Sequence, residues 1–245
     1  MALDSMKEIF DRMAEEGKPF WEIVLETDME ERQVSRSQSM AKMLTMWQAM
    51  VDAADNYTGR RRSVSGLVGG DGMKMRQYNF RGEAMTGGYV SEVIAEALSM
   101  AESNACMGRI VAAPTAGACG VLPAVLLPLC KYEELSQHQL LEALYVASGI
   151  GAVIAYRACI AGASGGCQAE IGTASAMAAG ALVALRGGDG QQIGHAVAMA
   201  LKNLMGLICD PVAGLVEVPC VTRNVIGAVN AVSVADMAMA GITSQ

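Results

Sequence analysis

Three of the seven cysteines stand in glycine- or proline-rich breaks between apolar segments of the sequence. Cys167 follows Gly-Ala-Ser-Gly-Gly, Cys209 precedes Asp-Pro, and Cys220 follows Val-Pro. Glycine lets the backbone approach a bulky inorganic group, and proline stiffens the turn that aims a side chain. Thiolates are the ligands that iron–sulfur clusters and zinc take in proteins. The three residues are therefore candidate metal ligands, with unrelated buried thiols as the alternative.

The spacing of these cysteines does not choose between the two interpretations, because the sequence contains no Cys-x-x-Cys pair. Zinc competes with a cluster, but the only histidines, His138 and His195, stand in expected helices without the spacing of zinc ligands. Cys130 and Cys159 stand in apolar helical runs, and Cys106 stands near an expected helix end. We expect these three to be packed as small hydrophobic residues.

The elements that must position these thiols are predicted to be helices. Hydrophobic residues make up 52% of the 245 residues but aromatic residues only 4%, so the apolar mass lies in Ala, Val, Leu, Ile and Met. Ala, Leu and Met favour helices, and small side chains favour close helix packing. We predict an all-α fold: one compact domain over 1–245, with charged amphipathic helices in 1–62 and an apolar core of Gly- and Pro-interrupted helices around a cluster site in 63–245.

Helix boundaries follow from apolar spacing and from capping residues. Ser5 with Glu8 and Ser136 with Gln139 match the capping-box pattern. Helices are expected near Ile9 and, by apolar periodicity, over about 37–55, 90–105, 121–130, 137–160, 171–186, 190–206 and 224–240.

A glycine-rich segment, 65–72, has the sequence Ser-Gly-Leu-Val-Gly-Gly-Asp-Gly. It lacks the Gly-Lys-Ser/Thr ending of a phosphate-binding P-loop, and no β-rich run precedes it. It is either a flexible turn or a loop that brings backbone amides to a small anionic ligand.

The net charge, the N-terminal sequence and the prolines in the longest uncharged stretch each argue against one class of protein. A formal net charge of -7 argues against binding nucleic acid, and the short basic run 60–62 is interpreted as a solvated turn. The first residues show no basic segment followed by an apolar one, so we expect no secretory signal and a cytoplasmic location.

The uncharged stretch 110–130 is long enough to cross a membrane, but Pro114, Pro123 and Pro128 interrupt it. Buried helices, without a membrane, are expected.

Four blocks of this sequence resemble the α subunit of iron–sulfur L-serine dehydratase, also called L-serine ammonia-lyase. The likeness runs over the whole chain, and the block that holds the second and third cysteines is highly specific. The N-terminal helices and the glycine-rich segment fit as well. The blocks are Ala-Pro-Thr-Ala-Gly-Ala-Cys-Gly (113–120), Gly-Gly-Cys-Gln-Ala-Glu-Ile-Gly (165–172), the nineteen residues from Gly206 to Asn224, and Ala-Met-Ala-Gly (238–241).

The resemblance implies that Cys167, Cys209 and Cys220 hold a four-iron, four-sulfur cluster whose fourth iron has no protein thiolate. That iron would act as a Lewis acid on the hydroxyl of L-serine, and a base would remove the Cα proton. Water leaves, and the aminoacrylate product hydrolyses to pyruvate and ammonia. This chemistry belongs to amino-acid degradation and gluconeogenesis.

The loop 113–120 is expected to bind the substrate. Thr115 and the backbone around Gly117 are predicted to donate hydrogen bonds to the substrate carboxylate. Cys119 is kept out of the ligand set, because family members carry other small residues there. Glu170 and Lys202 are interpreted as structural ion-pairing residues, with proton transfer as the alternative.

The sequence departs from the family pattern in two ways. It stops at Gln245, where family α chains continue, and no cysteine follows Cys220 to occupy the open iron as in single-chain relatives. The Ser-Ser-His-Thr-type motif of the family's other half is also absent, so we expect a β-subunit partner in a hetero-oligomer. The alternatives are a related cluster-dependent lyase, such as an L-cysteine desulfidase, and a non-catalytic iron–sulfur protein.

Overall fold

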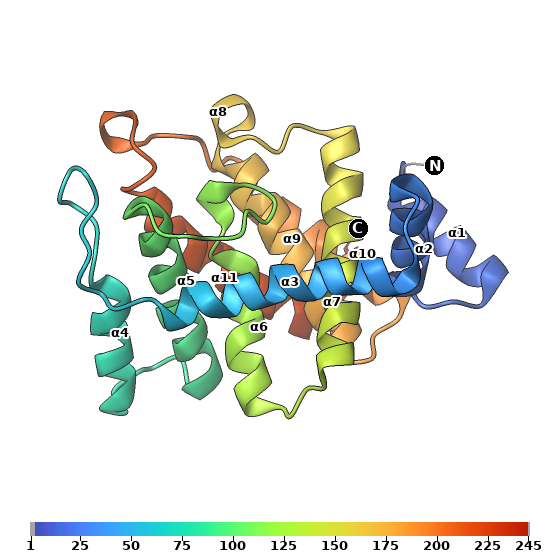
Figure 1. Ribbon diagram of the computed structural model, residues 1–245, viewed down its shortest axis with the longest axis horizontal. Helices are drawn as coiled ribbons and strands as arrows, with labels where there is room; N and C mark the ends of the chain where they lie inside the picture. The colour runs from blue at the N-terminus through green and yellow to red at the C-terminus, as the bar shows by residue number, and fades with distance from the viewer. Residues whose placement is uncertain (1–2, 245) are drawn as a thin grey trace.

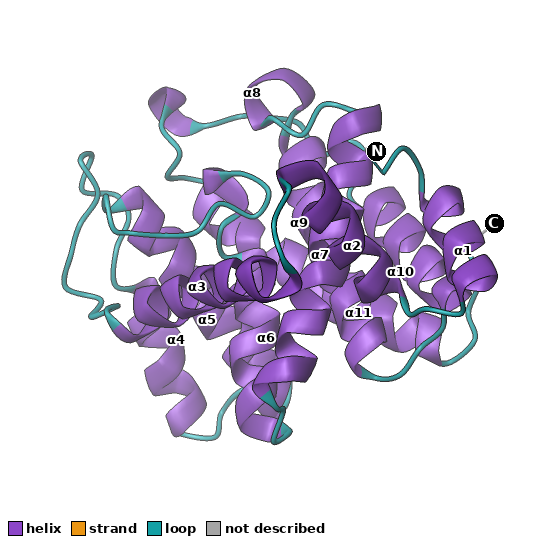
Figure 2. Cartoon of the chain, turned by 45° about the vertical axis from the view of Figure 1, so that its right-hand side comes forward, coloured by secondary structure: helices purple, strands orange, loops and turns teal. Residues whose placement is uncertain are grey.

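The computed structural model describes residues 3–244, and within them the regular structure is entirely helical. The all-α prediction is confirmed (Figures 1 and 2). In chain order the elements are α1 (Met6–Glu16), α2 (Phe20–Arg32), α3 (Arg36–Asp55), α4 (Asp71–Phe80), α5 (Gly88–Ala105), η1 (Ala116–Ala118), α6 (Val121–Tyr132), α7 (Gln137–Arg157), α8 (Gly162–Gly165), α9 (Cys167–Leu185), α10 (Gly190–Asn203), η2 (Val212–Gly214) and α11 (Cys220–Met239).

Helix α9 lies at the centre of the molecule and packs against α6, α7, α10 and α11 (Figure 1). Nearly every residue from Ile171 to Val183 is buried, and most of them are Ala, Gly or Ser. A methyl group added at Gly180 would come within 2.1 Å of Ile150 Cδ1. Small residues therefore let neighbouring helices approach α9 closely, as the shortage of aromatic residues indicated.

The capping residues set several helix starts as expected. Ser136 and Gln139 form a complete capping box on α7, and Ser5 Oγ accepts a hydrogen bond from the Glu8 amide at 3.1 Å. Glu8 itself caps the amide of Asp4. Helices α2 and α4 were not predicted, because α2 is buried on more than one side and α4 is short and strongly polar.

Two predicted boundaries were wrong in a way that matters for the cysteines. Helix α9 begins at Cys167, four residues before its predicted start at about 171. Helix α11 begins at Cys220, four residues before its predicted start at about 224. Their N-cap residues are Gly166 and Pro219. Glycine and proline next to the thiols were interpreted as breaks, but here they mark the point at which each helix starts.

The glycine-rich segment 65–72 does present its amides to an anion, and that anion belongs to the protein. The carboxylate of Glu102, 1% exposed, accepts hydrogen bonds from the amides of Gly70, Asp71 and Gly72 at 3.1, 2.8 and 3.3 Å. Tyr57 also donates its hydroxyl to Glu102. Glu102 thus satisfies the free N–H groups at the start of α4, where a negative charge is favoured.

One helix in the described part of the chain, α7, is long and apolar enough to cross a membrane, and 61% of its apolar window is buried inside the protein. Core helices of soluble proteins have the same character. The stretch 110–130, considered from the sequence, instead divides into a loop, η1 and the shorter α6.

Candidate functional site

The three predicted ligands lie where loops 106–120 and 204–219 meet the first turn of α9, and these segments are in the upper part of Figure 1. Cys167 and Cys220 each open a long helix, and Cys209 lies in the loop between α10 and α11. A helix start carries free N–H groups and a partial positive charge, which favours a thiolate. At two of the three cysteines the helix start therefore favours negative sulfur, against the burial that raises the pKa values of both thiols.

An arginine joins the three cysteine segments. Arg223 Nη1 donates to Cys167 Sγ at 3.1 Å, and its Nη2 pairs with the carboxylate of Asp210, the neighbour of Cys209. Its side chain is only 12% exposed. Because Arg223 stands one helical turn after Cys220, a single guanidinium connects all three segments.

Glycine is required where the loop of Cys209 reaches α9. Gly166 adopts φ 76° and ψ 179°, a conformation essentially restricted to glycine. A methyl group there would lie 3.3 Å from the Leu207 carbonyl oxygen and 3.5 Å from the Cys209 nitrogen. The Gln168 amide donates to that carbonyl at 2.7 Å, and Gln168 Oε1 accepts from the Gly206 amide at 2.8 Å. The backbone of Cys209 is thereby fixed beside Cys167.

The thiols influence one another electrostatically. Burial is the largest cause that raises the pKa of Cys220, to about 11, and the neighbouring Cys167 and Cys209 contribute in the same direction, while Arg223 opposes them. Burial also raises the pKa of Cys167 above its usual value, against the hydrogen bond from Arg223. Within residues 3–244, however, no three His, Cys, Asp or Glu side chains are arranged to hold a single metal ion.

The predicted substrate loop contacts the first turn of α9. Thr115 donates its hydroxyl to Glu170 Oε1. A methyl group at Gly117 would lie 2.7 Å from both carboxylate oxygens of Glu170, and one at Gly162 would lie 2.7 Å from Oε2. The carboxylate therefore fits between two glycines and beside Thr115, and none of the ion pairs among residues 3–244 includes it, contrary to the expectation. Lys202, the other expected ion-pairing residue, donates to Ser244 Oγ at 3.0 Å.

A buried asparagine ties the substrate loop to the helix that begins at Cys220. Asn224, 1% exposed, accepts from the Gly120 amide at 2.9 Å and donates to the Gly117 carbonyl at 2.8 Å. It also donates to the carbonyl of Cys220 at 3.0 Å. One side chain thus fixes the end of the loop, its middle and the start of α11 relative to one another.

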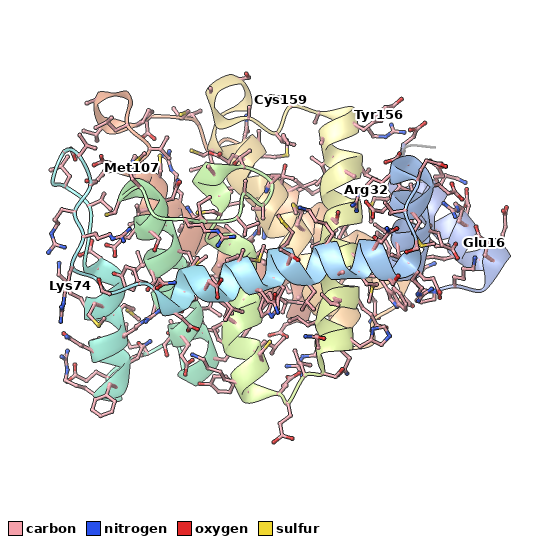
Figure 3. All side chains as sticks on the ribbon, in the orientation of Figure 1. Glu16, Arg32, Lys74, Met107, Tyr156 and Cys159 are labelled. Carbon is pink, nitrogen blue, oxygen red and sulfur yellow. The ribbon has the colours of Figure 1, made fainter. Side chains whose placement is uncertain are left out.

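Of the four remaining cysteines, three are buried or half-buried and one is exposed. Cys119 is fully buried, its thiol points to the Met100 carbonyl, and burial raises its pKa to about 12. Cys130 packs against the core and Cys106 is half-buried at the end of α5. The expectation for Cys159 was wrong: α7 ends before it, and the residue is exposed in the loop before α8 (Figure 3).

Sequence reasoning assigned no role to Arg223 or Asn224. The signal was present in their spacing, since residues three and four positions after Cys220 share its side of a helix. It could be used only once α11 was known to begin at Cys220.

Comparisons with known proteins identify the family of this chain. The chain matches the family "Serine dehydratase alpha chain" over residues 15–245. It is 40% identical over 241 residues to the "Probable L-serine dehydratase, alpha chain" of Bacillus subtilis (strain 168), covering 98% of this chain and 80% of that protein. It is 37% identical over 243 residues to the "L-serine dehydratase, alpha chain" of Peptoniphilus asaccharolyticus, covering 99% and 83%.

A third relative is longer than this chain. "L-serine dehydratase TdcG" of Escherichia coli (strain K12) is 47% identical over 144 residues, which is 58% of this chain and 32% of that protein. The family match spans nearly all of the chain, and the two alpha chains are similar over most of their own length. This chain therefore belongs to the serine dehydratase alpha-chain family.

Proposed function

We propose that this chain is the catalytic subunit of an L-serine dehydratase, which converts L-serine to pyruvate and ammonia with a four-iron, four-sulfur cluster held by Cys167, Cys209 and Cys220. The observation that carries the proposal is Arg223, which contacts Cys167, pairs beside Cys209 and stands one turn after Cys220. Family membership and the names of the relatives support L-serine as the substrate.

The described side chains do not form the convergent donor set of a single zinc ion, and a cluster does not require one. A single zinc ion would draw its sulfur ligands to about 2.3 Å from one point, and the described side chains offer no such group of three. In a cluster each thiolate binds a different iron, so the sulfurs stand farther apart. Thiolates and sulfides carry negative charge. The starts of α9 and α11 at Cys167 and Cys220, and the guanidinium of Arg223 near Cys209, offset part of that charge.

When bound, such a cluster supplies a Lewis acid at an iron without a protein thiolate. The residues of the chain bind and orient the substrate. Thr115 and Gly117 are proposed to line the substrate site, as expected from the sequence. Because the hydroxyl of Thr115 already donates to Glu170, and two carboxylates repel each other, we propose that the substrate ammonium, not its carboxylate, faces Glu170.

A β subunit is proposed as the partner, since both relatives similar over most of their length are named alpha chains. The identity of the base that removes the Cα proton is assigned to neither chain. A cytoplasmic location is part of the same proposal. Full turnover of L-serine by this chain alone, with its cluster rebuilt under anaerobic conditions, would refute the need for the partner.

Iron content separates ligands from bystanders without an activity assay. Iron, sulfide and visible absorption would be measured after anaerobic reconstitution of the unchanged protein and of five variants: Cys167→Ser, Cys209→Ser, Cys220→Ser, Cys119→Ala and Cys159→Ala. We expect the first three to lose the brown absorption and most of the iron. The last two should keep both. A colourless unchanged protein, or equal loss in all five variants, would contradict the cluster.

The identity of the substrate and the role of Thr115 are tested by measuring pyruvate formation. Pyruvate formation from L-serine, L-threonine and L-cysteine would be compared with the β partner present, because L-cysteine desulfidase is the nearest rival activity. The highest kcat/KM names the substrate. Thr115→Val should raise the KM for L-serine, because Glu170 loses the hydroxyl that orients it. An unchanged KM would remove Thr115 from the substrate site.

A further inference from the structure

A recess of about 530 Å³ opens between the end of α3, the second half of α4, the first half of α5 and the end of α6. These helix segments lie at the lower left of Figure 1, whereas α8 and the cysteine loops lie at the top. The volume is within the range of small-molecule sites. None of the residues assigned to the cluster or to the substrate lines the recess.

Two of the side chains that line the recess each hold a buried acceptor atom with no donor within residues 3–244. These atoms are Glu96 Oε1 and Asn79 Oδ1. Glu96 is 7% exposed, and its other oxygen, Oε2, accepts from Arg76 Nη2 at 3.0 Å. The side-chain nitrogen of Asn79 donates to the Ser91 carbonyl at 2.7 Å. This hydrogen bond fixes the side-chain amide, whose oxygen Oδ1 has no donor among the described residues. A buried polar atom without a partner is costly, at about 1–3 kcal/mol each, and is rare in native proteins.

The chemistry of the wall selects the kind of ligand. Both unpaired atoms are acceptors, so the missing partner donates hydrogen bonds. The wall has one more negative than positive charge. Its charged side chains are the carboxylates of Asp55, Glu92 and Glu96 and the cations of Arg76 and Lys131. The rest of the lining includes Ala54, Ala95, Leu127 and Pro128, which suit an organic body.

We propose that this recess binds a small organic molecule through its primary ammonium group, which donates to Glu96 Oε1 and Asn79 Oδ1. A primary ammonium carries one positive charge and three donors, which match the net negative charge of the wall and its two unpaired acceptor atoms. Burial raises the pKa of Glu96 above its usual value, with Arg76 opposing, and an ammonium beside it would favour the ionised carboxylate. A simple amine and a free α-amino acid share this group. Lys131, 71% exposed and 4.0 Å from the carboxylate of Glu92, is the lining cation that would meet the carboxylate of an amino acid.

Binding is tested on the full-length chain by calorimetric titration with three probes. Ethylammonium has the donors without a carboxylate, L-alanine has both, and tetramethylammonium has the charge without donors. We expect saturable binding of ethylammonium, L-alanine or both, and none of tetramethylammonium. Tighter binding of L-alanine than of ethylammonium identifies an amino acid as the ligand, and the reverse order identifies a simple amine.

A matched pair of variants locates the site. Glu96→Gln should weaken binding at least tenfold, because it removes the buried carboxylate that receives the ammonium. Glu92→Gln removes the same charge from the same recess. Its carboxylate is 38% exposed, pairs with Lys131 and already accepts from Tyr132, so a change of less than about threefold in ethylammonium binding is expected. Asn79→Ala provides a second variant if Glu96→Gln fails to fold.

No saturable binding of either donor probe at millimolar concentration would overturn the proposal. Equal weakening in Glu96→Gln and Glu92→Gln would also overturn it, because long-range charge would then explain the effect. These measurements follow binding and not turnover, so they are independent of the proposed dehydratase activity.

Discussion

Replacing Asn224 with alanine should detach the substrate loop from the helix that begins at Cys220. Asn224 makes three hydrogen bonds, to the Gly120 amide, the Gly117 carbonyl and the Cys220 carbonyl, at 2.9, 2.8 and 3.0 Å. The Cys220 carbonyl lies in the first turn of α11, where the helix supplies its own donor. The two loop groups lose their partners in the variant.

The size of the effect follows from those two groups. A buried backbone group left without a partner costs about 1–3 kcal/mol. The Gly120 amide is buried and the Gly117 carbonyl is partly buried, so together they give a loss of about 3 kcal/mol in the free energy of unfolding, with an upper limit near 6 kcal/mol. A typical domain has about 5–15 kcal/mol in total, so the variant should remain folded but clearly weakened.

The assay is urea unfolding of the full-length chain followed by circular dichroism, together with hydrogen exchange of the Gly120 amide. Asn56→Ala is the control, because the Asn56 side chain makes one exposed hydrogen bond, to the Asp52 carbonyl at 2.7 Å. Exposed substitutions of this kind usually change stability by about 0.5 kcal/mol or less. Asn224→Asp should cost at least as much as Asn224→Ala, because it turns an acceptor toward two carbonyls.

A loss of less than about 1 kcal/mol for Asn224→Ala, with unchanged exchange at Gly120, would refute the reasoning. It would mean that water satisfies both loop groups as well as Asn224 does. A large loss in Asn56→Ala as well would show that the assay does not distinguish buried from exposed asparagines.

Two further predictions concern the loops around the cysteines. Gly166→Ala should cost about 1–3 kcal/mol, because its backbone conformation is essentially restricted to glycine, and should lower iron uptake by displacing the loop of Cys209. Gly187→Ala has a similar φ of 75° with open space around it, so urea unfolding should show a smaller loss and iron counts should not change. Hydrogen bonds from Ser63 and Ser65 hold the pKa of Glu217 below its usual value, so its contribution to stability is present above about pH 4.5 and is lost as pH falls through the folded-state pKa. Urea unfolding from pH 7 to pH 3 should therefore show a weaker acid dependence in Glu217→Gln, and an identical dependence in both proteins would contradict the assignment.

The sequence by itself determined the fold class and the set of cysteines worth considering. An apolar chain that is poor in aromatic residues favours helices that pack through Ala and Gly, and α9 packs in this way. The capping box at Ser136 was predictable, because it depends on residues three positions apart. Family blocks were recognisable for the same reason, since each is a continuous run of residues.

Only the tertiary structure decided which atoms meet. The helix starts at Cys167 and Cys220 were missed, because glycine and proline mark both breaks and helix starts, and the choice depends on packing. The contact of Arg223 with Cys167 joins residues 56 positions apart, and that of Asn224 with Gly117 joins residues 107 apart. Hydrogen bonds between distant segments leave no periodic pattern in a sequence, because periodicity records only which face of one element is buried.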